Sequence, residues 1–151
     1  MALPVLLLTL LIASVTDLRR REIPNWLMAA AAVAGVGLAI AEGRDGSSLL
    51  FSLLAAAPFL LANLVRPEGM GMGDVKLVAV IGLYLDQQVW IALAAGLALA
   101  GLTGVLIALG KRLPPSRTAL PLAPFLAIGS VLSIAVTWSE LSTLVVPITV
   151  A

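Results

Sequence analysis

The chain contains no cysteine and no histidine among its 151 residues. Without cysteine, disulfides, thiol nucleophiles and cysteine-ligated zinc are excluded; without histidine, the usual general base and the commonest metal ligand are missing. Charged residues are also scarce, at 11% of the chain. Carboxylates are therefore almost the only side chains left for acid–base chemistry, and we expect neither a metal nor a cofactor.

Apolar residues are abundant instead, at 61% of the chain, and the mean hydropathy is +1.12. Soluble domains are about half apolar and a quarter charged, so this composition indicates an integral membrane protein. A spanning helix needs roughly 20 apolar residues. The predicted spans are residues 2–18, 26–41, 47–65, 75–86, 88–110 and 121–138.

We therefore predict an all-α, polytopic membrane protein of six transmembrane helices, forming one membrane-embedded domain over residues 1–151. The first apolar stretch has no basic segment before it, so we expect a retained helix instead of a signal peptide. The segment 141–151 is too short to span, and we expect it against the bundle or at the membrane interface.

The distribution of basic residues predicts how the helices are oriented. Eight of the nine lysines and arginines fall on one side of the predicted bundle, and the positive-inside rule makes that side cytoplasmic, with both termini outside. No basic run is long enough to suggest nucleic-acid binding.

Two aspartates, Asp17 and Asp74, each lie where an apolar segment meets a polar loop. Carboxylates at the edge of a bilayer are costly and tend to line functional cavities. The predicted topology places both at the cytoplasmic face and at the same depth. Each also has a simpler interpretation, Asp17 as a counter-charge to the following arginines and Asp74 as a helix N-cap.

The loops around the two aspartates have features of their own. Gly71 and Gly73 admit backbone conformations with positive φ and let another segment approach closely. Pro24 and Asn25 are a helix-start signal that keeps the first loop short. Lys76 is a candidate for tuning Asp74 or contacting substrate, although a lysine at a helix end also extends to the interface without any such role.

Two neighbouring carboxylates cannot easily both ionise, so such a pair shares a proton. The ionised acid then acts as general base on water while the protonated acid polarises a scissile carbonyl. The pattern favours an aspartic protease.

The chain resembles the type IV prepilin peptidase family. The resemblance lies in three segments in matching order: Asp17-Leu18-Arg19 with Ile23-Pro24-Asn25, then Gly71-Met72-Gly73-Asp74-Val75-Lys76-Leu77, then Pro121-Leu122-Ala123-Pro124-Phe125. It implies that Asp17 and Asp74 are the catalytic pair. It also implies cleavage of a basic leader after a glycine, at the cytoplasmic face of the bacterial inner membrane, from a prepilin-like substrate with an N-terminal hydrophobic helix in the lipid.

Larger members of that family resemble fusions with a cysteine-bearing cytoplasmic portion and also methylate the trimmed pilin. This sequence lacks both the length and the cysteines, so it looks like a peptidase-only form similar to those of Flp-type tight-adherence pili. Methyltransferase activity is not expected.

Three alternatives stay open at this point. A small proton- or cation-coupled transporter subunit would use Asp17 and Asp74 nearer the bilayer midplane. A catalytically silent assembly protein could retain the same fold. A presenilin-like intramembrane protease shares the Gly-x-Gly-Asp pattern but has a tyrosine after its first aspartate, where this chain has Leu18.

Overall fold

The computed structural model describes residues 2–44, 46–66, 71–111 and 120–145. Within these residues the chain is all-α, as the composition predicts. The helices are α1 (Ala2–Arg20), α2 (Asn25–Ala41), α3 (Ser47–Val65), α4 (Met72–Leu85), a short 3₁₀ helix η1 (Asp86–Gln88), α5 (Val89–Lys111) and α6 (Ala123–Val145).

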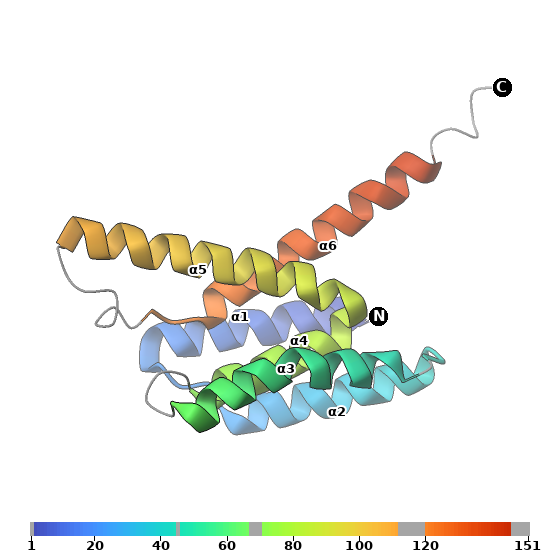
Figure 1. Cartoon of the computed structure of the whole chain (residues 1–151). Helices are drawn as coiled ribbons and strands as arrows, with labels where there is room; N and C mark the ends of the chain where they lie inside the picture. The colour runs from blue at the N-terminus through green and yellow to red at the C-terminus, as the bar shows by residue number, and fades with distance from the viewer. Residues whose placement is uncertain (1, 45, 67–70, 112–119, 146–151) are drawn as a thin grey trace.

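Successive α-helices run in opposite directions, and α4 lies at the centre of the bundle (Figure 1). It contacts each of the other five α-helices, most extensively α3. Its apolar side chains form much of the core, and Leu77, Val78 and Ile81 are fully buried. Helix α6 packs along α5 and α1, and its C-terminal part extends away from the bundle (Figure 1).

Three described stretches are long and apolar enough to cross a membrane: Ala2–Arg20, Ser47–Val65 and Met72–Gly110. The third holds both α4 and most of α5, which reverse direction at η1 (Figure 1). Helix α2 and the stretch Ala123–Ser139 are apolar but shorter. The chain is therefore a membrane protein, whereas the six spans and the outside location of both termini stay predictions.

Local signals explain where the helices around the first loop end and begin. Arg21 has a left-handed φ of 53°, and its amide donates to the Asp17 carbonyl at 2.9 Å, which closes the last turn of α1. Pro24 then occupies the N-cap of α2, and its carbonyl accepts from Leu27 and Met28. The predicted helix start at Pro24 and Asn25 is confirmed.

At its C-terminal end, α6 continues to Val145, past the predicted end of the last span at residue 138. Residues 141–145 therefore continue α6 and extend away from the bundle instead of lying against it, and their place at the membrane interface stays a prediction (Figure 1). The remainder, 146–151, lies outside the described residues.

Glycines let the helices of the bundle approach each other closely. A Cβ at Gly82 of α4 would lie 2.7 Å from Cα of Ser52 on α3, so no side chain fits there. Beside it, the Ser52 hydroxyl donates to the Ala79 carbonyl at 2.7 Å. Gly129 of α6 packs in the same way against the backbone of Ala92 and Gly96 on α5. The first contact fixes α4 against α3, and the second fixes α6 against α5.

Candidate active site

A cavity of about 340 Å³ opens at the end of the bundle where α1 ends and α2 and α4 begin. Both Asp17 and Asp74 line it, although α2 and α3 separate them in the sequence. The full lining is Asp17, Arg21, Glu22, Ile23, Asn25, Gly71, Met72, Gly73 and Asp74. The structure thus brings the two predicted aspartates to one site.

Asp17 lies near the C-terminal end of α1 and is buried, with 7% of its surface exposed. Its Oδ2 accepts a hydrogen bond of 3.0 Å from the backbone amide of Ala123. Ala123 is the first residue of α6, where the backbone N–H groups have no partner within the helix. Asp17 therefore ties α1 to the start of α6 and has a fixed orientation.

Asp74 lies in the first turn of α4 and is partly buried. We expected it at the helix N-cap, and that prediction is wrong. The N-cap is Gly71, with φ −72° and ψ 141°, and the Asp74 amide donates to the Gly71 carbonyl at 3.1 Å. The helix starts earlier than the sequence pattern indicates, and Asp74 lies in its first turn, where it lines the same cavity as Asp17.

The glycines of the cavity act through close approach and not through unusual backbone angles. The only described glycines with positive φ are Gly43 and Gly46, which lie at the other end of α2, so Gly71 and Gly73 do not use the positive φ that glycine admits. A Cβ at Gly73 would lie 3.2 Å from Cβ of Ile23. The segment that approaches Gly73 closely is the α1–α2 loop, whereas close approach of a substrate chain stays a prediction. Gly69 lies outside the described residues.

The other predicted site residues differ in position. Asn25 lines the cavity, and its side-chain oxygen accepts a hydrogen bond of 2.8 Å from Lys76 Nζ. Lys76 does not line this cavity. It lies two residues after Asp74 on α4 and lines a second cavity instead. Pro24 is also outside the lining and serves as the cap of α2.

Sequence reasoning missed several residues that the structure places here. Four such residues line the cavity: Ile23 and Met72, which lie within the motif segments, and Arg21 and Glu22, which lie between Arg19 and Ile23. The sequence could not indicate the role of Ala123, because the contact is made by its backbone amide and not by its side chain. Only the nearby Pro121 and Pro124 indicated that a helix starts there. In the part of the chain that the structure describes, no group of three acids is placed to hold a metal ion.

Comparison with known proteins identifies a family. Residues 4–109 match the model of the type IV leader peptidase family, a range that includes α1 to α4, both aspartates and most of α5. Searches of curated proteins and of solved structures give no significant match. Helix α6, which provides the Ala123 amide, lies beyond the matched range. Because the match covers more than half of the chain, the protein belongs to the type IV leader peptidase family.

Proposed function

We propose that the protein is a membrane aspartic endopeptidase that removes the basic leader peptide from type IV prepilin-like precursors, with Asp17 and Asp74 as its catalytic pair. The observation that carries the proposal is that both carboxylates line one cavity at the end of the bundle. Membership of a leader peptidase family supports peptide hydrolysis as the reaction.

In the proposed mechanism the two carboxylates hold one proton between them. The ionised acid removes a proton from water as the water oxygen attacks the scissile carbonyl carbon, and the protonated acid donates to the carbonyl oxygen. The acid that took the proton from water then donates it to the leaving amine as the C–N bond breaks, and a hydroxyl of the tetrahedral intermediate returns its proton to the other acid as the new carboxyl group forms. Since the Ala123 amide occupies Oδ2 of Asp17, we assign Oδ1 to the attacking water.

The charge of the cavity supports a basic leader as the substrate. Its lining holds three acids, Asp17, Glu22 and Asp74, and one base, Arg21. An excess of negative charge in a cleft attracts cationic ligands and speeds their association. Gly71 and Gly73 form part of the wall. A glycine before the scissile bond fits beside them because it brings no side chain of its own.

The proposal includes the membrane setting. We place the site at the cytoplasmic face of the bacterial inner membrane, in a six-span topology with both termini outside, because the basic residues gather on the side of the two aspartates. The substrate class is the Flp-type precursor, and the activity is peptidase alone, without methylation.

The position of the acids within their helices argues against proton or cation transport. Asp17 lies three residues before the end of α1, and Asp74 is the third residue of α4. Transport sites are usually near the bilayer midplane, at breaks within helices. Acids at helix ends are instead within reach of a leader peptide at the membrane surface.

The test is cleavage of a purified type IV prepilin by the detergent-solubilised protein, comparing wild type with Asp17→Asn and Asp74→Asn. Each substitution should lower kcat by about 10²- to 10⁴-fold, because each removes one partner in proton transfer. Glu42→Gln, which neutralises an exposed acid just beyond the opposite end of α2, should cleave like wild type. Retained cleavage in both aspartate variants, with the fold verified by circular dichroism, would contradict the dyad.

A further inference from the structure

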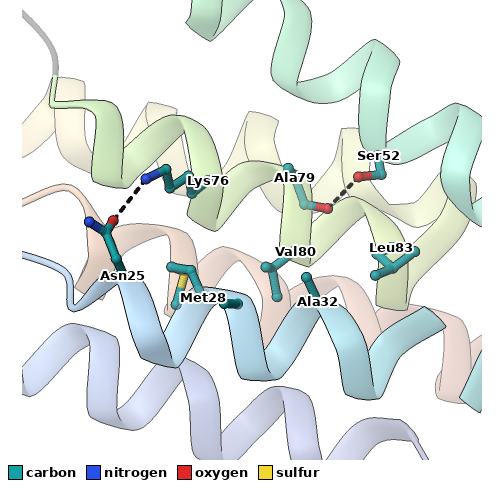
Figure 2. Close-up of a pocket in the computed structure, with 9 residues that line it drawn as sticks. Asn25, Met28, Ala32, Ser52, Lys76, Ala79, Val80 and Leu83 are labelled. Atoms are coloured by element: carbon teal, nitrogen blue, oxygen red, sulfur yellow. Dashed lines mark hydrogen bonds between the residues drawn. The ribbon is translucent and has the colours of Figure 1, made fainter. Parts of the chain in front are cut away.

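A second cavity, a groove of about 510 Å³, lies between α2, α3 and α4 (Figure 2). Helices α2 and α3 both pack against α4 and scarcely against each other along their described lengths. The groove is lined by Asn25, Met28, Ala29, Ala32, Ser52, Lys76, Ala79, Val80 and Leu83. On the α2 side, two of the lining residues are alanines, whose short side chains leave space in the groove. Small residues allow another helix to approach closely in a membrane.

The groove adjoins the aspartate cavity, with which it shares one lining residue. Asn25 lines both, and its hydrogen bond with Lys76 joins α2 to α4 at the end of the groove nearest the aspartates (Figure 2). From this pair the groove follows α2 to Ala32 and α4 to Leu83. Seven residues of α-helix span about 10 Å, so the groove is about two helical turns long.

A different groove, of about 420 Å³, lies between α1 and α6 and serves as a comparison. Ile128 and Leu132 are among its lining residues, and it shares none with the aspartate cavity. Its lining is almost entirely hydrocarbon, which lipid chains can cover. The groove of Figure 2 differs because the polar side chains of Asn25 and Lys76 lie at one end, and beyond them its lining is apolar except for Ser52, whose hydroxyl donates to the Ala79 carbonyl.

We propose that the groove between α2, α3 and α4 binds the first two turns of the substrate's own apolar helix. This inference rests on the proposed function, since it places the scissile bond, which precedes that helix, beside Asp17 and Asp74. The substrate helix enters sideways from the lipid. Its N-terminal end passes Asn25 and Lys76, and the leader continues into the acidic cavity.

The absence of cysteine makes a direct test possible, because any introduced cysteine is the only thiol in the protein. Ala29→Cys places a thiol in the groove, whereas Ala30→Cys places one on the neighbouring, equally exposed position outside it. Ile128→Cys places one in the α1–α6 groove. Each is made in an Asp74→Asn background and incubated with a short bismaleimide and a type IV prepilin carrying one cysteine about seven residues into its apolar helix.

The expected result is a covalent adduct with Ala29→Cys at least tenfold more abundant than with Ala30→Cys or Ile128→Cys. Equal yields at the three positions, a preference for Ile128→Cys, or no adduct at all would overturn the inference. No adduct from a protein whose wild type does cleave would mean that lipid fills the groove.

Cleavage by the wild-type protein, measured in parallel, separates this inference from the function on which it rests. If wild type cleaves the prepilin but the Ala29→Cys variant gives no more adduct than the other two, the groove assignment alone is wrong. If wild type does not cleave but the Ala29→Cys variant still gives the highest adduct yield, the groove binds the helix and the peptidase proposal is wrong.

Discussion

The backbone amide of Ala123 donates a hydrogen bond of 3.0 Å to Oδ2 of Asp17. This contact joins the first and last α-helices of the described chain at the site. A carboxylate that serves as general base must be held in one orientation, because misplacement of a catalytic group lowers the rate steeply. Ala123 acts through its backbone, so only a substitution that removes the N–H tests its contribution.

Ala123→Pro should lower kcat by about 10- to 100-fold, the equivalent of losing a hydrogen bond to a charged group, with KM little changed. Proline is tolerated at the first helical position, so α6 should still form. Ala123→Gly keeps the N–H and is the matched control. Full activity in Ala123→Pro, or equal losses in both variants with their thermal unfolding unchanged, would show that the amide does not position Asp17.

Gly73→Ala should lower kcat/KM for prepilin cleavage because its Cβ would lie 3.2 Å from Ile23 and push the α1–α2 loop away from α4. Gly71→Ala, whose Cβ would meet nothing closer than 3.7 Å, should be affected less. The double variant Gly73→Ala/Ile23→Ala relieves the contact and should recover activity. An interaction energy near zero in this double-mutant cycle would mean that the two residues do not act through each other.

Gly82→Ala should destabilise the protein by about 1–3 kcal/mol, the usual cost of overpacking a core. The added Cβ would meet the backbone of Ser52, which has no side-chain freedom with which to move aside. Gly101→Ala on α5 is the control, because a Cβ there meets nothing within 4 Å. Thermal unfolding in detergent measures both, and equal transition temperatures for the two variants would contradict the close α3–α4 contact.

Asp86→Asn should reduce stability without reducing cleavage. Asp86 Oδ2 lies 3.3 Å from Arg44 Nη1, which also donates to the Leu83 carbonyl at the end of α4 opposite the aspartate cavity. The pair is partly buried, so we expect a loss of about 1 kcal/mol, more than for Glu42→Gln, whose carboxylate is more exposed. A large fall in kcat at unchanged stability would show that this end of the bundle takes part in the reaction.

Much of this protein follows from short-range patterns in the sequence. The apolar composition predicts membrane helices, because only helices and closed barrels satisfy the backbone in lipid. Pro24 and Asn25 predict the start of α2, since proline is suited to a helix start and not to its interior. Asp17 and Asp74 stood out for a similar reason, because an acid at the edge of an apolar segment is costly unless it has a role.

Only the tertiary structure shows which residues from distant parts of the sequence come into contact. Three features depend on segments far apart in the sequence. The Ala123 amide of α6 orients Asp17 of α1, Gly73 of α4 meets Ile23 of the α1–α2 loop, and Lys76 lies in the second groove and not in the aspartate cavity. No local pattern carries such information. It arises from how closely glycines such as Gly82 let the helices pack around α4. The structure also shows that α4 begins at Met72, which places Asp74 in the first turn and not at the cap.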